Sequence, residues 1–335
     1  MKIHYFSSEP WEEAYVRTKL PDETIEFHGG PLSAFPDLSD PEADALCVFI
    51  ESTIGEAELA RFPKLKLIAT RSTGFDHIDL TVAKARGITV ANVPSYGEHT
   101  VAEFTFALLL ALSRRVIDAD ERVRETGTFS QAGLRGFDLA GKTIGVVGCG
   151  HIGCHTIHMA NGFGMKVLGF DVNRDDALCQ KLNFTYATLP ELFAASDIVT
   201  LHVPYNPHTH HLVNRGNIGT FKKGSYLINT SRGAVVETQA IVDAIQNGTL
   251  AGAALDVLEE EGELVDEEAL LTSAHPGEAQ LKIALENHYL ILHPRVIVTP
   301  HIAFNTTGAV ERILNTTAEN IASFKVGTPM NIVAV

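Results

Sequence analysis

An arginine and a histidine stand just after two apolar runs of the sequence, where strands are expected to end. Arg232 follows residues 226–229, and His301 follows residues 296–299. A guanidinium binds a substrate carboxylate through two parallel hydrogen bonds, which an ammonium cannot do. An imidazole, with an ordinary pKa of ~6.5, can give or take a proton at neutral pH. Together the two side chains could hold a carboxylic acid and protonate a carbonyl oxygen that receives a hydride.

A glycine-rich turn follows the apolar run 143–147 and opens a helical pattern that extends to about residue 163. Its glycines have the spacing Gly-x-Gly-x-x-Gly, at Gly148, Gly150 and Gly153. The first glycine permits a tight turn, the second leaves room for a pyrophosphate, and the third lets the helix approach the strand. The amides at the start of the helix would then face the phosphates. This context predicts a dinucleotide-binding turn.

The next strand-like run ends at Asp171, close to the ~20 residues after the last glycine at which such sites carry an acidic residue. A carboxylate there accepts hydrogen bonds from the adenosine ribose and repels the extra phosphate of NADP. Asp171 could instead cap the next helix, and Arg174 could favour NADP. We predict NAD as the cofactor.

Short apolar runs alternate with helical patterns along the chain, which predicts parallel sheets with crossover helices. The expected strands are residues 3–6, 24–27, 46–50, 65–70, 88–93, 143–147, 166–170, 198–203, 226–229, 253–257 and 296–299. The expected helices include residues 10–20, 54–62, 80–86, 100–115 and 306–325. Residues 259–280 are acidic and irregular, and we expect them to form a surface excursion.

Several phrases of the sequence resemble the D-isomer-specific 2-hydroxyacid dehydrogenases. They are TIGVVGCGHIG, DIVTLHVP, LINTSRGAVV, GAALDVLEEE and VIVTPHIAFNTT, and the last, with TRSTGFDHIDL, is most similar to the D-lactate dehydrogenase branch. The resemblance implies an α/β fold of two doubly wound parallel-sheet domains. A Rossmann NAD-binding domain, residues 100–302, would be inserted in a flavodoxin-like substrate domain, residues 1–99 and 303–335, with a closing cleft between them.

The resemblance also implies catalytic roles. Arg232 would bind the substrate carboxylate, His301 would be the acid/base, and Glu261 would pair with that histidine. The residues alone do not separate Glu261 from Glu259 or Glu260, because all three could form a solvated acidic turn.

Further contacts follow from the same resemblance. In the substrate domain, backbone amides of residues 72–75, including Thr73 and Gly74, would bind the carboxylate. Tyr96 and Phe304 would cover the substrate, unless they only pack in the core. Asp256 would contact the nicotinamide amide. The residues expected to contact the cofactor are Val101, Gly148, Gly150, His151, Ile152, Gly153, Asp171, His202, Val203, Pro204, Thr230, Ser231 and Asp256.

The implied activity is the NAD-dependent interconversion of a small 2-oxo acid, most simply pyruvate, and the D-2-hydroxy acid, D-lactate. Glu51 and Asn305 depart from the branch, in which tyrosines are usual. Glu51 would disfavour pyruvate if it pointed inward, but we expect it to point to solvent. The alternatives are a dehydrogenase for glyoxylate, hydroxypyruvate or a branched 2-oxo acid, and an NAD-sensing corepressor-like interaction protein.

Composition limits the partners. The chain has 26 Lys and Arg against 41 Asp and Glu, a net charge of −15, which disfavours nucleic acid and anionic membranes. It shows neither a ~20-residue apolar run nor a secretory signal, so we expect a cytoplasmic protein. The four cysteines are expected to be inert buried thiols.

Two further expectations concern metal and assembly. His208, His210 and His211 (PHTHHL) are expected to form a surface loop, so no metal site is predicted. The bridging helix 100–115 and the polar arm 117–138 would pair two subunits into a homodimer, as the resemblance implies.

Overall fold

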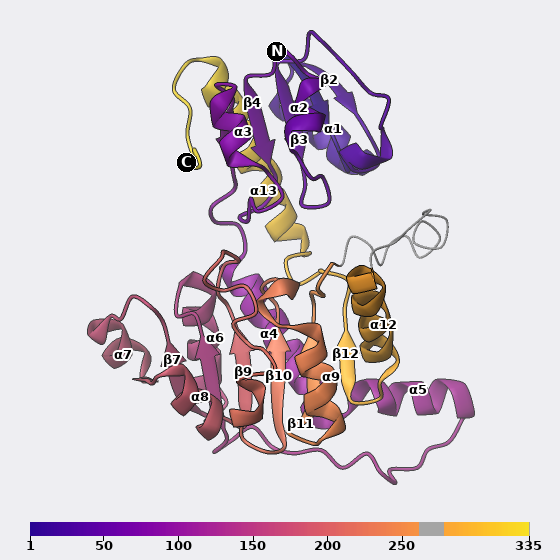
Figure 1. Ribbon diagram of the computed structural model, residues 1–335, viewed down its shortest axis with the longest axis vertical. Helices are drawn as coiled ribbons and strands as arrows, with labels where there is room; N and C mark the ends of the chain where they lie inside the picture. Colours follow the sequence, from indigo (N-terminus) through magenta and orange to yellow (C-terminus); the bar gives the residue numbers. More distant parts are fainter. Residues whose placement is uncertain (261–277, 335) are drawn as a thin grey trace. The chain divides into compact units, whose positions relative to one another are not determined.

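The computed structural model describes residues 1–260 and 278–334 (Figure 1). The chain divides into two compact units, one of Met1–Gly97 with Asn305–Val335 and one of Glu98–Phe304. Every strand pair in both units is parallel. The predicted α/β class with two parallel sheets is confirmed.

The smaller unit contains a five-stranded sheet in the order β2-β1-β3-β4-β5. This order is that of flavodoxin-like folds. The strands are β1 (Lys2–Tyr5), β2 (Thr24–Phe27), β3 (Ala45–Val48), β4 (Leu67–Thr70) and β5 (Thr89–Ala91). Residues of β3 and β4 are buried on both faces, as a parallel sheet covered on both sides requires.

Helices cover both faces of this sheet. Alternate residues of the strands pack on α1 (Pro10–Lys19) and α13 (Thr307–Lys325), with Tyr5, Cys47 and Leu314 in one core. The intervening residues face α2 (Glu56–Ala60) and α3 (Leu80–Ala85), with Leu46 and Phe62 in the other core. A 3-10 turn, η1 (Leu32–Ala34), follows β2.

The larger unit contains a seven-stranded sheet in the order β12-β11-β10-β9-β6-β7-β8. The direction of winding reverses between β6 and β9, where ligands bind in open α/β sheets. The strands are β6 (Thr143–Val147), β7 (Lys166–Phe170), β8 (Thr185–Tyr186), β9 (Ile198–Leu201), β10 (Ser225–Asn229), β11 (Leu250–Leu255) and β12 (Val296–Val298).

The helices of this unit also form two layers. On one face, α4 (Glu98–Arg114) and α6 (His151–Gly162) share a core that includes Leu109, Ile157 and Ile198. On the other face lies a core with Phe193, Ile241 and Leu290, from α8 (Leu189–Ala195), α9 (Thr238–Gln246) and α12 (Glu278–Leu292). The short α7 (Asp176–Leu182) follows β7, and two 3-10 turns are η2 (Ile218–Thr220) and η3 (Gly233–Val235).

Three elements depart from the sequence predictions. The polar arm, for which no helix was predicted, starts with α5 (Val116–Thr126), visible at the side of the larger unit in Figure 1. The surface excursion was expected over residues 259–280, but helix α12 already begins at Glu278. The third is β8, a two-residue edge strand. Most of the excursion, including Glu261, lies outside the described residues.

Candidate active site

The glycine-rich turn joins β6 to α6. Gly148 has a φ of +94°, and a Cβ atom there would lie 2.7 Å from the carbonyl oxygen of His202. A Cβ atom at Gly153 would lie 2.0 Å from the carbonyl oxygen of Gly148, whereas one at Gly150 would meet nothing within 4 Å. The first and third glycines are therefore required by close packing, and the second borders open space.

The amino end of α6 has unsatisfied amides next to that space. Gly150 is the N-cap, and no side chain caps the helix. The first amides of a helix have no acceptor within it, and the helix dipole adds positive potential there. His151 and Ile152, both predicted cofactor contacts, supply amides of this first turn. The arrangement fits a phosphate group.

Asp171 lies at the carboxyl end of β7 and faces the same turn. One carboxylate oxygen accepts a hydrogen bond from the amide of Cys149 at 2.8 Å, and the other accepts one from the amide of Asn173 at 2.8 Å. The helix that follows is capped by Asp175, not by Asp171. The capping alternative is therefore wrong, and Asp171 instead links the second strand to the glycine turn.

His202 follows β9 at the switch point. Its Nε2 atom lies 3.2 Å from the Thr156 hydroxyl and 3.0 Å from the Thr200 hydroxyl. Burial lowers the pKa of His202 to about 3, so the ring is neutral at physiological pH. Val203 is half-buried and Pro204 is exposed. His202 thus joins α6 to β9 beside the glycine turn.

The loop after β10 is organised by Asn229. Its side-chain oxygen accepts hydrogen bonds from the amide and the hydroxyl of Ser231, and its amide donates to the carbonyl oxygen of Arg232 at 2.9 Å. Arg232 also donates to the carbonyl oxygen of Ser231 at 2.8 Å. Thr230 is buried and its hydroxyl lies 3.0 Å from that of Thr105. The role of Asn229 was not predicted, although an asparagine at a strand end signals such a turn.

A buried carboxylate holds the loop that carries His301. Asp256 directly follows β11, is only 1% exposed, and accepts hydrogen bonds from the Thr299 hydroxyl (2.6 Å) and from the amides of Ile302 (3.0 Å) and Ala303 (2.8 Å). The amide of His301 donates to the carbonyl oxygen of Asp256 at 2.8 Å. Burial raises the pKa of Asp256, while these hydrogen bonds oppose the rise. The contacts give Asp256 a positioning role that the sequence did not indicate, and the predicted nicotinamide contact stays a prediction.

The acidic turn after β11 contains one residue that is not solvated. Glu259 is 8% exposed and accepts hydrogen bonds from the amide and hydroxyl of Thr238. Its other oxygen lies 2.5 Å from Nε2 of His211. The hydrogen bonds of Glu259 therefore connect the start of α9 to the PHTHHL loop. The expectation that Glu259 could belong to a solvated turn is wrong.

In the smaller unit, a loop follows β4 at the carboxyl edge of the sheet. Two side-chain hydroxyls stabilise this loop. The Ser72 hydroxyl donates to the carbonyl oxygen of Gly74 at 2.6 Å, and the Thr73 hydroxyl donates to that of Val93 at 2.8 Å. Over residues 1–260 and 278–334, the amides of Thr73 and Gly74 have no hydrogen-bond acceptor. Two neighbouring free amides on a braced loop fit an anionic oxygen ligand.

The remaining predicted contacts differ in exposure. Val101 is buried in α4, and Tyr96 and Phe304 are half-buried. The carbonyl oxygen of Tyr96 accepts a hydrogen bond from Arg312 of α13. Glu51 is exposed and accepts a hydrogen bond from the Ser7 hydroxyl at 3.1 Å, and Asn305 is exposed.

Within the larger unit, three of the predicted site residues follow the carboxyl ends of adjacent strands. Arg232 follows β10, Asp256 follows β11 and His301 follows β12, on the same sheet as the glycine turn. Among the described residues, no helix has the length and apolar character needed to cross a membrane. A doubly wound sheet with this turn, and with an acidic residue after its second strand, is typical of an NAD-binding domain.

The comparisons with known proteins agree. Residues 106–303 match the sequence model of the D-isomer specific 2-hydroxyacid dehydrogenase NAD binding domain. The chain is 32% identical to D-lactate dehydrogenase of Escherichia coli, over 98% of both chains. It is 38% identical to glyoxylate reductase of Thermofilum pendens, over 84% of this chain and 78% of that one. A crystal structure of Aquifex aeolicus D-lactate dehydrogenase with NAD and lactic acid has a TM-score of 0.87 and 35% identity, covering 97% and 96%.

The chain therefore belongs to the D-isomer-specific 2-hydroxyacid dehydrogenases. The resemblance on which the sequence predictions relied is confirmed, as are an enzymatic activity of this family and NAD as the cofactor. The residues of the glycine turn, Asp171 and the amino end of α6 fit this cofactor.

Proposed function

We propose that the protein interconverts pyruvate and D-lactate, with NAD as the redox partner. The observation that carries the proposal is the hydrogen-bond network of Asp256. It attaches the His301 loop to the end of β11, which pairs with β10, the strand before Arg232, on the sheet of the glycine turn. Reduction of a 2-oxo acid requires a cation that binds the carboxylate and an acid/base group that protonates the carbonyl oxygen.

Arg232 would bind the substrate carboxylate through two charge-assisted hydrogen bonds. The unpaired amides of Thr73 and Gly74 would contribute further donors to the same carboxylate. Fixing the carboxylate at these points fixes which face of the carbonyl carbon meets the nicotinamide, and so selects the D product.

His301 would act as the acid. NADH, when bound, supplies a hydride to the carbonyl carbon, and negative charge then develops on the carbonyl oxygen. His301 would give this oxygen a proton, which completes the D-2-hydroxy acid, and would take the proton back in the reverse reaction. Glu261 would stabilise the imidazolium form of His301.

Pyruvate is favoured by the D-lactate dehydrogenase among the relatives and by the environment of Glu51. That carboxylate is exposed and bonded to Ser7, which supports the view that it does not enter the pocket. The glyoxylate reductase among the relatives keeps glyoxylate as the second candidate. Steady-state rates of NADH oxidation with pyruvate, glyoxylate, hydroxypyruvate and 2-oxoisocaproate test the choice: the highest kcat/KM should be with pyruvate. A higher value with another acid would replace this substrate but keep the class.

The corepressor-like alternative predicts tight NADH binding without turnover of any 2-oxo acid. Turnover with one of them would exclude it as the main function. No segment of the described residues specifically favours it.

We also propose a homodimer and a cytosolic location. Exposed apolar side chains on α5 and the arm support the dimer: Val116 (54%), Ile117 (41%), Val123 (43%) and Phe129 (95%). Isolated exposed apolar residues are ordinary, but several on one arm are typical of an interface. The four cysteines are free, with Cys47 and Cys149 buried and Cys154 and Cys179 half-buried, which suits a reducing compartment.

A further inference from the structure

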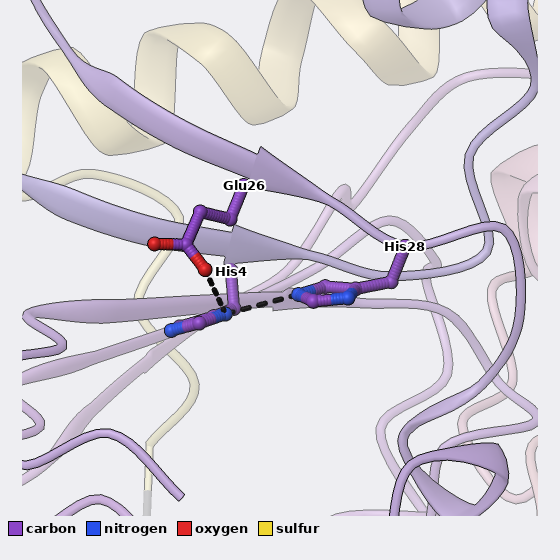
Figure 2. A group of neighbouring side chains, drawn as sticks. All are labelled: His4, Glu26 and His28. Carbon is purple, nitrogen blue, oxygen red and sulfur yellow. Dashed lines mark hydrogen bonds and ion pairs between the residues drawn. The ribbon is translucent and has the colours of Figure 1, made fainter. Parts of the chain in front are cut away.

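Three side chains with metal-binding atoms meet at one edge of the smaller sheet. His4 of β1 and Glu26 of β2 are partners in the strand register, and His28 follows two residues after Glu26 on the same face. Figure 2 shows the two imidazoles edge to edge with the carboxylate beside them. None of these residues belongs to the proposed active site. The sequence alone did not reveal the group, because residues 4 and 26 become neighbours only by strand pairing.

The ligand atoms are close enough to share one ion. Nδ1 of His4 lies 3.0 Å from Nε2 of His28 and 3.7 Å from a carboxylate oxygen of Glu26. All three ligand atoms lie within 4.8 Å of one another. Ligands at 2.0–2.2 Å from a tetrahedral zinc ion lie about 3.3–3.6 Å apart, so the observed spacing needs only a small adjustment.

A second carboxylate fixes the orientation of the buried ring. Nε2 of His4 lies 2.9 Å from a carboxylate oxygen of Asp40 and therefore carries a proton. Nδ1 of His4 is then the nitrogen that can bind a metal. A carboxylate that accepts a hydrogen bond from the non-ligating nitrogen of a histidine is the usual outer partner of zinc-binding histidines.

Metal binding would require the ring of His28, which packs against Phe6 and Phe35, to turn. His4 is 1% exposed and packs against Phe6 and Phe62, so its position is set by the core. His28 is half-exposed and lies just beyond the end of β2. Its ring is within 18° of the plane of the His4 ring, and the two nitrogens now point at each other. In the present contact Nε2 of His28 donates to Nδ1 of His4, so metal binding would move the His28 proton to Nδ1, and a turn of the ring would then direct both lone pairs to one ion.

The charge of the cluster suits a divalent cation. Glu26 and Asp40 contribute two negative charges, and Lys2 contributes one positive charge, with Nζ 3.0 Å from Glu26 and 2.6 Å from Asp40. With neutral imidazoles the group therefore has a net charge of −1. Lys2 also reduces the attraction for a metal ion.

We propose that His4, Glu26 and His28 bind one Zn²⁺ ion, with water as the fourth ligand. Two imidazoles and one carboxylate are a common zinc-binding set. The ion would join β1 to the edge strand β2, so it would stabilise the smaller unit and take no part in hydride transfer. This proposal differs from the sequence prediction, which assigned no metal site.

Isothermal titration of the metal-free full-length protein with ZnCl2 tests the proposal. We expect one equivalent of zinc to bind and to raise the unfolding temperature. His28→Ala and Glu26→Gln should each weaken binding by tenfold or more, with His28→Ala the larger loss. His208→Ala, in the PHTHHL loop, is the matched control and should leave the affinity unchanged. NADH oxidation equal to that of the wild type would show that these variants fold.

Lys2→Gln gives a test in the opposite direction. Because it removes the competing ammonium from both carboxylates, it should tighten zinc binding, whereas a variant that merely disturbs the fold would weaken it. Failure of the full-length protein to bind zinc would overturn the proposal. Binding that persists in His28→Ala but is lost in His208→Ala would place the ion in the loop and would also overturn it.

Discussion

The backbone of His301 has a φ of +52°, in the left-handed region that few residues other than glycine adopt. Its amide lies 2.8 Å from the carbonyl oxygen of Asp256 and 3.0 Å from that of Thr299. A constrained conformation of this kind costs free energy, and the surrounding hydrogen bonds maintain it. The geometry fixes where the imidazole leaves the chain.

The variant His301→Asn tests the acid/base role without changing this backbone, because asparagine also tolerates the left-handed region. We expect kcat to fall by about 10²–10⁴, the usual contribution of a positioned acid/base group. The dissociation constant of NADH, measured by fluorescence titration, should stay unchanged. A kcat within a few-fold of the wild type would remove His301 from the mechanism.

Variants of Arg232 test whether this side chain binds the substrate carboxylate. Hydrogen bonds to charged groups contribute ~1.5–3 kcal/mol each, so losing two in Arg232→Ala should lower kcat/KM by at least about 10². Arg232→Lys, the matched variant, keeps the charge but not the paired donors. Its kcat/KM should lie between those of the wild type and Arg232→Ala. Equal kcat/KM values for all three proteins would contradict the assignment.

For single residues, the sequence indicated which polar side chains follow strands, but it did not indicate the hydrogen-bond partners of those side chains. His301 and Arg232 stand out because each lies within three residues of the end of an apolar run. The roles of Asn229, Glu259 and Asp256 depend on contacts with residues that are distant in the chain or with their own loop backbone. Three consecutive glutamates cannot be distinguished by pattern, and only the fold shows that Glu259 is buried and engaged.

The turn between β6 and α6 allows a test of cofactor binding that is separate from a test of folding. A Cβ atom at Gly150 meets no atom of the described residues within 4 Å, so Gly150→Ala should cost no more than the ~1 kcal/mol of an N-cap change. The added methyl group would occupy space that we assign to the pyrophosphate, so the dissociation constant of NADH should rise at least tenfold.

Gly162→Ala is the control on the same helix, since its Cβ atom also meets nothing within 4 Å. It lies at the far end of α6, and NADH binding should be unchanged. Replacing a helical glycine by alanine should slightly raise stability, by up to ~1 kcal/mol. Normal NADH binding by Gly150→Ala would contradict the placement of the phosphates.

The loop between β12 and α13 depends on Asp256. In Asp256→Asn, the side-chain NH2 group replaces a carboxylate oxygen and faces an N–H or O–H donor that it cannot accept. The lost hydrogen bond should cost ~1–3 kcal/mol of stability and lower kcat. Thr188→Ala removes the cap of α8 and should cost a comparable ~1 kcal/mol. Its kcat should be normal. Equal kcat values for both variants would show that Asp256 acts on stability alone.

Elements with continuous apolar runs were predictable, and short or polar ones were not. The predicted limits of β6 and β7 agree with the structure, because both runs are apolar and end at glycine or aspartate. The two residues of β8 are too few to show a pattern. Helix α5 has only three large apolar residues, Val116, Ile117 and Val123, and it begins after Arg115, which is in a left-handed conformation and provides no side-chain cap, so the usual signals of a helix start are missing.

At the scale of the whole molecule, assembly is open to a direct test. One chain has a mass of 36.3 kDa. We expect light scattering to give about twice this mass, because α5 exposes apolar side chains that a partner would cover. Val123→Asp should shift the protein toward the single-chain mass. A wild-type protein that stays at 36.3 kDa would contradict the proposed homodimer.

The central claim is that this member of the family reduces a 2-oxo acid to the D-hydroxy acid. The most direct test is the configuration of the lactate formed when the purified protein is incubated with pyruvate and NADH, determined by chiral chromatography. The account predicts D-lactate in an amount equal to the NADH consumed. L-lactate, a racemic product, or NADH oxidation without lactate would contradict it.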